Sequence, residues 1–497
     1  MYEQEFPKFI KQFEQSLANL FKHEYNIDTL SLERGLPPEL WKKIMDSRPL
    51  SVAIPKEFGG RGSVVKECLS VLAAASYQSL PLSLTFGINI ALFLEPMAKY
   101  GDASIQREVF ENFLTNQNMG GLMITEPEYG SDALNMRTVN RKTADGYHIQ
   151  GTKHWQGLTG MANYWLIASR SEGADGALGR DIDFFLSNDA IPHQHIVVEE
   201  YYDNAGLYMI PYGLNKIDIN VPTTHRLIPE TTGIKMMLDI LHRSRMQFPG
   251  MGMGFIKRML DEALSQCTNR KVGVGNLLAM DNVQFQISRI QSAYTICSAM
   301  CAHSSNISGI EHNLATEGLE ANTMKSVVTD LMQESAQLLV QLSGANGYRT
   351  SHIGGRGIMD SRPFQIFEGS NEMLYAQIAE MVIKMMKKQK ELRLHEFLKS
   401  FSLTSLAVDH FGTEFGFSVN EQLPQRKLVD FGKIIARVIC VGYVMELSNK
   451  GFSKVLADNC IIMVRQEVSA LIAGLQFNNS VAVVDDYTPQ SSWSDFV

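Results

Sequence analysis

Apolar positions in the first part of the chain recur at three- and four-residue spacing. The stretches LSVLAAASY and NIALFLEPMAKYG show this period, and Gly101 directly after the second one is a helix stop signal. Such spacing places the apolar side chains along one face of a helix. The pattern therefore predicts that residues 1–118 form an N-terminal helical domain.

The period changes to two in the next part of the chain. YHIQG, YWLIAS, DFFLS, HIVVEEY and KIDINV are short β-type runs separated by clusters of Gly, Asn, Asp and Pro. No helical pattern lies between these runs to make parallel crossovers. We therefore expect a middle β domain over residues 119–230, built as an antiparallel barrel or sandwich.

Helical periodicity returns in long segments such as GMGFIKRMLDEALSQCTNRK and KSVVTDLMQESAQLLVQL. It predicts a helical bundle over residues 231–390. Residues 391–497 are also largely helical by pattern and end in the polar tail DDYTPQSSWSDFV. The predicted fold class is mainly α with a central antiparallel β-barrel or sandwich domain, in the order α–β–α, plus an extra C-terminal α-helical domain.

Composition and charge limit the kinds of protein that the chain can be. Its 497 residues are 45% hydrophobic and 20% charged, with a formal net charge of −8, which is typical of a globular protein. No basic excess is visible, which counts against nucleic-acid binding. The opening MYEQEFPKFIKQFEQ lacks the pattern of a signal peptide, and the apolar run IIARVICVGYVMEL contains Arg437 and is too short to span a bilayer. We expect a soluble protein without a membrane span.

Six cysteines in a chain of this length do not suggest a disulfide framework. Cys297 and Cys301 stand at helical i, i+4 spacing with His303 nearby, but the further ligands that a zinc site needs do not follow. Two thiols on a buried helix face are the favoured explanation, and no metal is expected. Free cysteines without an export signal favour a reducing cytoplasm.

The glycine-rich stretch PGMGMGF contains Gly250, Gly252 and Gly254 after a helix-like segment. It lacks the G-x-G-x-x-G spacing that follows a strand in dinucleotide-binding folds, so the close approach of two helices is the favoured explanation. The chain also has no Walker loop and no H-E-x-x-H. It has no G-x-S-x-G, so a serine hydrolase of the usual type is not supported.

Two stretches around the predicted β domain carry residues suited to chemistry. MITEPEYGSDALNMRT sets Thr125, Gly130 and Ser131 beside a proline turn, where N–H groups and hydroxyls can meet phosphate or a heteroaromatic ring. GYHIQGTKHWQG is a predicted strand pair with Trp155 near its end, and a tryptophan in that position is usually part of a core. Taken alone, the first stretch fits an ordinary loop and the second fits packing.

A third stretch lies far along the chain. QLSGANGY is a glycine-rich turn after a helix, and IFEGSNEM then places Glu368 between Phe367 and Gly369 at a helix start. Partial desolvation in that position raises the pKa of a carboxyl toward that of a general base. Taken alone, Glu368 also fits a carboxylate that the helix dipole favours near a helix N-terminus.

In combination, T-E-P-x-x-G-S-D, G-x-K-x-W and the later E-G-S-N-E, set in an α–β–α order, resemble the acyl-CoA dehydrogenase family of flavoproteins. The resemblance covers about residues 1–385. It implies FAD as the cofactor and Glu368 as the base that removes the α-proton of an acyl thioester, while the β-hydride passes to flavin N5 on the opposite face. It also implies that the backbone N–H of the base and a ribityl hydroxyl of FAD hold the thioester carbonyl.

The resemblance further implies three groups of binding residues. The cofactor contacts within one subunit would be Leu122, Ile124, Thr125, Gly130, Ser131, Trp155, Gln156, Gly157, Ser370 and Glu372. The neighbouring subunit of a homodimer or homotetramer would add Arg270, Gln341, Gly344 and Ala345. The residues on the substrate side would be Ser131, His242, Arg245 and Gly369.

The chain departs from the family pattern at several positions. Gln156 and Gly157 stand where the family usually has Ile-Thr, so the hydroxyl that the threonine directs at flavin N5 is missing. Ala345 replaces the second glycine of a GG turn. Glu380 stands where many members have arginine, and a carboxylate suits the phosphates of coenzyme A poorly.

The segment SLTFGINIALF resembles the part of the family that lines the acyl pocket. Gly87 and Ile88 leave room there, which points weakly to a medium or long acyl chain. Small residues on such a helix also serve helix packing, and packing is the favoured explanation.

Three hypotheses follow for the function. The first is FAD-dependent dehydrogenation of an acyl-CoA, with an electron-transferring flavoprotein as the expected electron acceptor. The second keeps the fold but takes an acyl group on a carrier protein or uses oxygen as the acceptor, as Glu380 and the extra C-terminal unit suggest. The third is a non-catalytic flavoprotein that binds DNA, against which the net charge of −3 over residues 391–497 counts.

Overall fold

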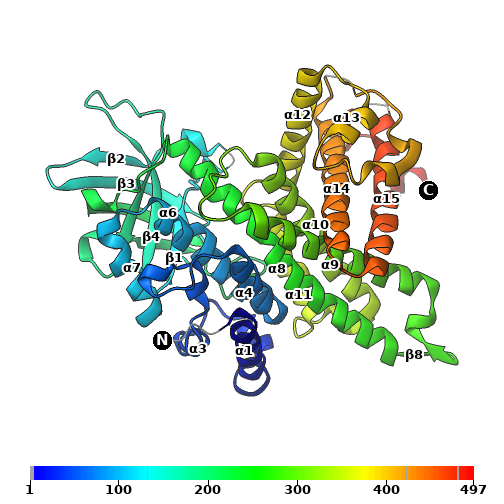
Figure 1. The fold of residues 1–497 in the computed structure, drawn as a ribbon, viewed down its shortest axis with the longest axis horizontal. Coiled ribbons are helices and arrows are strands. Elements are labelled where there is room, and N and C mark those ends of the chain that lie inside the picture. Colours follow the sequence, from blue (N-terminus) through cyan, green and yellow to red (C-terminus); the bar gives the residue numbers. More distant parts are fainter. Residues whose placement is uncertain (1–4, 131, 420–421, 478–480) are drawn as a thin grey trace.

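The computed structural model describes residues 5–130, 132–419, 422–477 and 481–497. Figure 1 shows a β unit at one end of the molecule, long helices across the middle and the C-terminal helices at the other end. The predicted class, mainly α with a central β unit and additional C-terminal helices, is confirmed by this order of elements.

The N-terminal helices pack against both the β unit and the first helix of the bundle. Their bounds are α1 Phe6–Asn19, α2 Ile27–Leu30, α3 Pro38–Met45, α4 Val65–Gln78, α5 Leu80–Asn89, α6 Glu95–Tyr100 and α7 Ala103–Thr115. Helix α5 follows Ser79, whose side chain accepts a hydrogen bond from the N–H of Leu82 and so caps the helix. A π-helical turn, Ile90–Leu94, joins α5 to α6, and Gly101 ends α6 as the sequence predicts.

The segment Leu80–Tyr100 is long and apolar enough to cross a membrane by length and composition alone. Of its most apolar 18-residue window, 94% is buried inside the protein. Its apolar side chains therefore already have partners within the fold, which is the usual state of a core helix.

The β unit is a curled sheet of short strands. Its strands are β1 Gly120–Met123, β2 Val139–Lys142, β3 Gly146–His154, β4 Tyr164–Ser171, β5 Asp183–Asn188, β6 Val197–Tyr201 and β7 Gly213–Pro222. They lie in the order β1-β4-β2-β3-β7-β6, and β5 pairs with β4. The runs that the alternating pattern marked as strands correspond to β3 through β7.

The sheet is mixed, which corrects the expectation of wholly antiparallel pairing. Strand β4 pairs in parallel with both β1 and β2, whereas the other pairs of the sheet are antiparallel. A parallel pair needs a long connection between its strands, but that connection does not have to be a helix. Here the β2–β3 hairpin carries the chain from the end of β1 back to the start of β4.

The helical bundle is built around α8, a helix of 37 residues. The bundle helices are α8 Gly233–Asn269, α9 Asp281–Ile307, α10 Gly318–Ser343, α11 Ile353–Ser361 and α12 Asn371–Gln389. A small hairpin of β8 Lys271–Val272 and β9 Gly275–Asn276 joins α8 to α9. Helix α8 packs on α4 along one side and on α10 and α9 along others, so it links the N-terminal helices to the bundle.

The glycines of α8 lie where neighbouring helices come closest, as the sequence analysis favoured. A Cβ atom on Gly254 would lie 2.0 Å from the carbonyl oxygen of Ala73 on α4. A Cβ atom on Gly252 would lie 2.4 Å from a side-chain carbon of Val328 on α10. Only residues without a side chain fit between these backbones.

Replacing Gly254 with alanine is expected to destabilise the protein by about 1–3 kcal/mol, because the added methyl group must push α8 and α4 apart. Gly474 offers a matched control, since it is also helical and a Cβ atom there would meet nothing within 4 Å. Alanine at position 474 should leave stability unchanged or raise it by about 0.4–1 kcal/mol. Urea unfolding of both variants checks the difference, and equal midpoints would contradict it.

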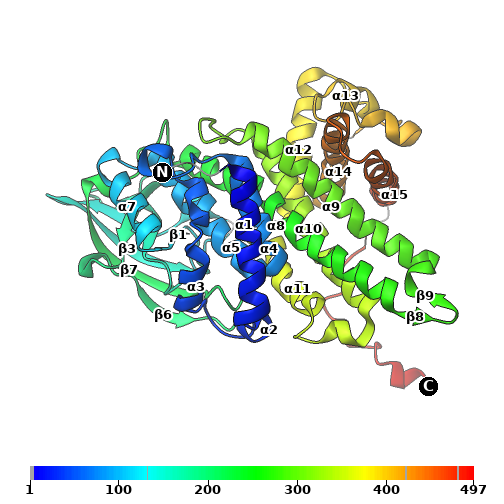
Figure 2. The same cartoon turned by 60° about the horizontal axis from the view of Figure 1, so that its bottom comes forward.

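The C-terminal helices form a unit that packs on the bundle. They are α13 Leu394–Ser400, α14 Gln425–Asn449 and α15 Lys454–Gln476. Helix α14 lies beside α12 and also contacts α9 and α15 (Figures 1 and 2). The apolar run around Arg437 belongs to α14 and is buried from Phe431 to Val444.

The cysteine pair of α9 packs as the favoured explanation expected. Cys297 is buried, Cys301 is half-buried, and both are free thiols. His303 donates from Nε2 to Glu320 Oε1 at 2.7 Å and stacks on Tyr443 at a centroid distance of 4.0 Å. This imidazole therefore belongs to the contact between the bundle and α14.

Candidate active site

A cavity of about 240 Å³ lies between the β unit and the helical bundle. Its walls come from α5 and the π turn after it, the turn after β1, the turn after β3, α8 and the segment before α12. The cavity gathers residues that the sequence predicts as site residues from separate stretches: Leu122, Ile124, Thr125, Gly130, Trp155, Gln156, Gly157, Arg245, Glu368 and Gly369.

Glu368 reaches this cavity from a strained backbone position. Its φ is +52° and that of Gly369 is +93°, both in the left-handed region. One carboxyl oxygen, Oε1, accepts a hydrogen bond from Ser244 Oγ at 2.9 Å. The other, Oε2, is buried and has no hydrogen-bond partner among the described residues. Because an unpaired buried carboxyl oxygen costs free energy, this atom marks a place for chemistry or for a ligand.

Two buried cations hold the backbone around Glu368. Arg245 donates from Nε and Nη2 to the carbonyl oxygen of Glu368, at 3.1 and 2.8 Å. Lys325 Nζ donates to the carbonyl oxygen of Gly369 at 2.7 Å. Within the part of the chain that the structure describes, the N–H groups of Glu368 and Gly369 donate to no other residue. The turn thus has two fixed carbonyls and two free donors.

The burial of this cluster shifts the acid–base behaviour of its members. Burial raises the pKa of the Glu368 carboxyl, and Arg245, Ser244 and Lys325 oppose that rise by favouring the carboxylate. Burial also lowers the pKa of the Lys325 ammonium to about 7. A carboxylate with a raised pKa binds a proton more readily than an exposed one, so Glu368 is suited to proton abstraction.

A buried ion pair fixes the turn after β1 that lines the cavity. Lys153 Nζ, on β3, donates to Glu126 Oε1 at 2.9 Å and to the carbonyl oxygen of Ile124 at 2.8 Å. The N–H of Thr138 donates to the same Glu126 oxygen at 2.9 Å. Burial lowers the pKa of the Lys153 ammonium to about 8, and both side chains are almost fully enclosed. The Glu of the T-E-P motif and the Lys of G-x-K-x-W are therefore a structural pair.

Trp155 leaves the end of β3 with a φ of +60° and is 51% exposed. Its ring contacts Tyr202 and Tyr212 at centroid distances of 4.6 and 6.1 Å. A tryptophan at a strand end is usually core, but this one presents an uncovered flat surface at the cavity. Such a surface suits contact with an aromatic ring.

The two residues after Trp155 explain why the usual Ile-Thr is absent. The amide of Gln156 donates to the carbonyl oxygen of Thr125 at 3.2 Å and accepts from Asn215 at 3.2 Å, so it is used inside the fold. A Cβ atom on Gly157 would lie 2.7 Å from Cδ1 of Ile88. A larger residue at this position would therefore push the end of the Ile88 side chain aside, and glycine fits without that shift.

His242 lies in an adjoining cavity of about 400 Å³ and not in the one that contains Glu368. Asn322, Glu380 and Lys384 line the same cavity. His242 Nδ1 lies 2.7 Å from the carbonyl oxygen of Leu314, and burial lowers the pKa of the imidazole to about 4. The ring is therefore neutral at pH 7 and donates from Nδ1.

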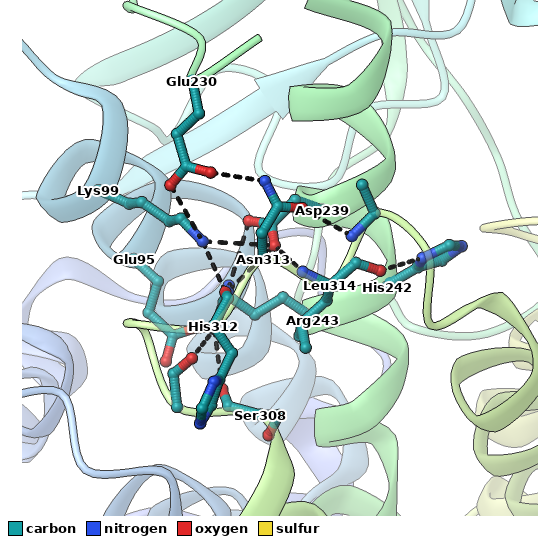
Figure 3. A network of polar contacts seen from close by, with 12 residues as sticks. Glu95, Lys99, Glu230, Asp239, His242, Arg243, Ser308, His312, Asn313 and Leu314 are labelled. Atoms are coloured by element: carbon teal, nitrogen blue, oxygen red, sulfur yellow. Dashed lines mark hydrogen bonds and ion pairs between the residues drawn. The ribbon is translucent and has the colours of Figure 1, made fainter.

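Figure 3 shows the polar network behind His242. Arg243 donates to backbone carbonyls of residues 308–312, and it pairs with Asp239 at 3.2 Å. Both side chains are buried, so each compensates the charge of the other. The network fixes the segment that leads into the wall of the adjoining cavity, at residues 315–318.

The residues assigned to a neighbouring subunit lie far from Glu368. A rise of about 1.5 Å per residue puts Arg270 about 38 Å from Arg245 along α8. A Cβ atom on Gly344 would lie 3.6 Å from Arg270 Nη1, and Gln341 and Ala345 flank that turn. The structure brings Arg270 and Gly344 together, but it does not bring them to the cavity of the same subunit.

The remaining predicted site residues are Ser131, Ser370 and Glu372. Ser131 lies outside the described residues. Ser370 caps α12, because its side chain accepts a hydrogen bond from the N–H of Met373 at 3.4 Å. Glu372 is exposed in the first turn of α12. The helix start that the sequence predicts after the base is therefore present.

Sequence reasoning missed part of the cavity wall and the support beneath Glu368. Leu84 and Leu92 belong to the segment SLTFGINIALF, which the resemblance assigned to the acyl pocket, whereas Ala133, Tyr212, Leu241 and Met373 are the unpredicted lining residues. Lys325 was missed because a lysine within a helix usually faces solvent. Its neighbours Met324, Val327 and Val328 are fully buried, and this apolar context on both sides was the signal that could have found it.

Comparisons with known proteins indicate the same family as the sequence motifs. Residues 10–117 match the N-terminal domain of acyl-CoA dehydrogenases, residues 121–217 the middle domain and residues 231–383 the C-terminal domain. The fold and the site define a flavoprotein oxidoreductase that acts on CH–CH donors. The chain belongs to the acyl-CoA dehydrogenase family, as its motifs predicted.

Individual relatives are distant in sequence. The chain is 22% identical over 343 residues to an acyl-CoA dehydrogenase of Bacillus subtilis, covering 68% of this chain and 87% of the relative. It is 23% identical over 360 residues to the mitochondrial short-chain specific acyl-CoA dehydrogenase of Mus musculus, covering 71% and 85%.

Solved structures share the fold. Butyryl-CoA dehydrogenase from Megasphaera elsdenii has a TM-score of 0.68 at 18% identity, over 77% of this chain and 99% of that one. An acyl-CoA dehydrogenase complexed with FAD from Bacillus anthracis has a TM-score of 0.75 at 17% identity, over 95% and 88%. The latter similarity extends over the C-terminal unit. A prolyl acyl carrier protein oxidase has a TM-score of 0.67 at 17% identity, over 77% and 100%.

FAD is the cofactor of this family, and the residues of the cavity fit it. The backbone from Leu122 to Thr125 and the flat face of Trp155 line one side of the cavity. A Cβ atom on Gly130 would meet nothing within 4 Å, so the turn leaves open space beside these residues. Glu368, whose Oε2 is buried without a partner among the described residues, lines the same cavity.

Proposed function

We propose that this protein removes the α- and β-hydrogens of an acyl thioester, with Glu368 as the base for the α-proton. The observation that carries the proposal is that Glu368 lines the cavity that fits the flavin and that its buried Oε2 has no hydrogen-bond partner among the described residues. Bound FAD would supply the acceptor for the β-hydride.

The surroundings of Glu368 support the remaining steps. The free N–H groups of Glu368 and Gly369 are suited to hold a thioester carbonyl as negative charge develops on its oxygen. They can do so because Arg245 and Lys325 fix the carbonyls on the other side of the turn. Each such donor contributes about 10²–10³ in rate in enzymes where it has been removed.

The apolar side of the cavity is suited to the acyl group. Leu84, Ile88 and Leu92 project into it from α5 and the π turn, and Leu241 adds a further apolar surface. Gly87 does not line the cavity, since a Cβ atom on it would lie 3.4 Å from Met251 Sδ. Gly87 therefore supports the packing explanation, and the acyl chain length remains to be measured.

Coenzyme A is the proposed carrier of the acyl group, and a carrier protein is the second candidate. The adjoining cavity is lined by Glu380, Lys384 and the neutral His242. A single lysine beside a carboxylate offers little charge for the phosphates of coenzyme A. This composition is the observation that favours a phosphopantetheine arm on a carrier protein, with its amides rather than its phosphates in contact.

The test is anaerobic titration of the FAD-loaded protein with thioesters. Acyl-CoA substrates of increasing chain length and the same acyl groups on a carrier protein are added in parallel, and flavin absorbance near 450 nm is followed. Bleaching by at least one thioester is expected. If no thioester bleaches the flavin, the proposed function is wrong. Repeating the reaction with oxygen or with an electron-transferring flavoprotein identifies the acceptor.

A homodimer or homotetramer is also proposed. It is supported by the distance of about 38 Å between Arg270 and Arg245, because only a second subunit could bring Arg270 to an FAD bound beside Trp155. Sedimentation of Arg270→Ala with and without FAD tests this, since the variant should keep its oligomeric state and lose cofactor affinity. A cytoplasmic location is proposed from the free cysteines.

Replacing Ser244 with alanine is expected to raise the pKa of Glu368 further, because a hydrogen bond to a charged group stabilises it by about 1.5–3 kcal/mol. A base must be deprotonated to accept a proton, so activity falls as the pH decreases through this pKa. The acidic limb of the kcat/KM profile should therefore move to higher pH. Ser244→Thr keeps the hydroxyl and should keep the wild-type limb. An acidic limb of the kcat/KM profile that stays unchanged in Ser244→Ala would contradict the assignment of Glu368 as the base.

A further inference from the structure

Helix α14 of the C-terminal unit is in direct contact with the helix that follows Glu368. A Cβ atom on Gly432 of α14 would lie 1.9 Å from the carbonyl oxygen of Tyr375 on α12. Tyr375 is fully buried, and both views show the two helices side by side (Figures 1 and 2). The C-terminal unit therefore meets α12 at its second turn, close to the segment that carries the base.

Tyr375 also makes a hydrogen bond to the carboxylate of Asp330. Its hydroxyl donates to Asp330 Oδ2, on α10, at 2.7 Å. The other oxygen of Asp330 accepts from Gln365 Nε2 at 2.6 Å and from Asn371 Nδ2 at 2.7 Å. Gln365 and Asn371 lie on the two sides of Glu368 in the sequence. One carboxylate thus ties both ends of the turn to Tyr375.

Asn371 connects this carboxylate to the turn itself. Its amide oxygen accepts from Lys325 Nζ at 2.9 Å, and the same ammonium donates to the carbonyl oxygen of Gly369 at 2.7 Å. Lys325, Asn371 and Gly369 therefore form one continuous set of hydrogen bonds with Asp330 and Tyr375. Lys325, Asn371 and Tyr375 are buried and Asp330 and Gly369 are half-buried, so these bonds lie largely in a low-dielectric environment that strengthens them.

Helix α14 also carries a buried cation, Arg437, five residues beyond Gly432. Arg437 is buried and donates from Nε to both carboxyl oxygens of Glu467 on α15, at 3.0 Å each. Its positive charge acts on Tyr375 and Asp330. The charged groups around this part of the protein include Arg245, Lys325, Asp330, Glu372, Lys433, Arg437 and Glu467.

We propose that the C-terminal unit positions Glu368, with Tyr375 and Asp330 as positioning residues that transmit the contact of α14 to the carbonyl of Gly369. The proposal rests on the proposed role of Glu368 as the base. It assigns to residues 391–497 a part in the reaction, beyond covering the apolar faces of α9 and α12. A base held within less than an ångström of its productive place gains rate because misplacement is costly.

The experiment compares three variants of the full chain loaded with FAD. Gly432→Ala presses α14 against the backbone of Tyr375. Gly442→Ala is the matched control, because its Cβ atom would meet the carbonyl oxygen of Leu403, within the C-terminal unit, at 2.5 Å. Tyr375→Phe removes one hydroxyl and leaves the packing, so it tests the proposal even where Gly432→Ala fails to fold.

Two measurements separate positioning from general stability. The first is kcat and KM for flavin reduction by a thioester. Tyr375→Phe and Gly432→Ala should lower kcat by about 10- to 100-fold with little change in KM. The second is amide hydrogen exchange of the peptide over residues 364–374 in the protein without FAD, which should become faster in both variants. Gly442→Ala should leave kcat and this peptide unchanged, even where it lowers Tm.

The proposal is overturned if Tyr375→Phe has the kcat and exchange rates of the wild type, or if Gly442→Ala changes both as much as Gly432→Ala does. Failure of the proposed function is a different result. In that case no thioester bleaches the flavin of the wild type, or a thioester reduces the flavin of Glu368→Gln at the wild-type rate.

Discussion

Flavin reduction by an acyl thioester is expected to slow by about 10²–10⁴-fold when Glu368 is replaced by glutamine, the range that a positioned general base contributes. Glutamine keeps the size and the hydrogen bond with Ser244 but has no oxygen that can take up the α-proton. Oε2 of Glu368 is the free atom of the pair, so the loss falls on the step that needs it. Anaerobic stopped-flow measurement of flavin bleaching checks the rate.

Two controls make this result specific. Glu396 is exposed on α13, so Glu396→Gln changes a carboxylate without touching the cavity, and its rate should stay close to that of the wild type. FAD content should be unchanged in both variants, because the carboxyl of Glu368 supports no part of the turn after β1. A Glu368→Gln variant that still bleaches at the wild-type rate would remove the base from the mechanism.

The pH dependence of the wild type follows from the same burial. Burial raises the pKa of Glu368, and the base acts only as a carboxylate. Activity should therefore decline with falling pH at a higher pH than the ordinary pKa of a glutamate would give. Arg245 limits this effect, since its guanidinium lies beside the carbonyl of Glu368 and favours the ionised form.

Much of the fold was readable from local patterns. The alternation in KIDINV predicted β7, because one face of that strand is buried and the period of a strand is two. YWLIAS also marked a strand, β4, but its six residues from Tyr164 to Ser169 are buried on both faces of the sheet. Gly252 and Gly254 were assigned to close helix packing, because a run of small residues on a helix leaves room for a second backbone. These signals depend only on neighbouring residues in the sequence, so they can be recognised without knowledge of the tertiary structure.

The parallel pairing of β4 was not readable, because strand order depends on which edges meet in space. Within the site, the sequence predicted Glu368 and the turns that face it. It did not predict Lys325 or Asp330, which stand on α10 and reach the base only through the packing of α10 on α12. A buried lysine and a buried aspartate have no motif, since each looks like a surface residue until its partner is known.

FAD binding is expected to be lost, and stability to fall by about 3–5 kcal/mol, when Lys153 is replaced by methionine. Glu126 would then be a buried carboxylate without its cation, and the turn from Ile124 onward would lose the donor that holds its carbonyl. The cavity wall at Thr125 depends on this turn. Urea unfolding measures the loss of stability, and flavin content after dialysis with excess FAD measures the loss of cofactor binding.

A double replacement separates charge burial from cofactor binding. In Lys153→Met with Glu126→Gln, no charge is left buried, so most of the lost stability should return. The hydrogen bonds that Lys153 makes to Ile124 are still missing, so FAD affinity should recover less than stability. Lys216→Met removes a lysine that is exposed and 3.8 Å from Glu199, and it should change neither quantity. If the Lys153 variant binds FAD as tightly as this control, the ion pair does not shape the cavity, and the form of the turn must come from the sheet alone.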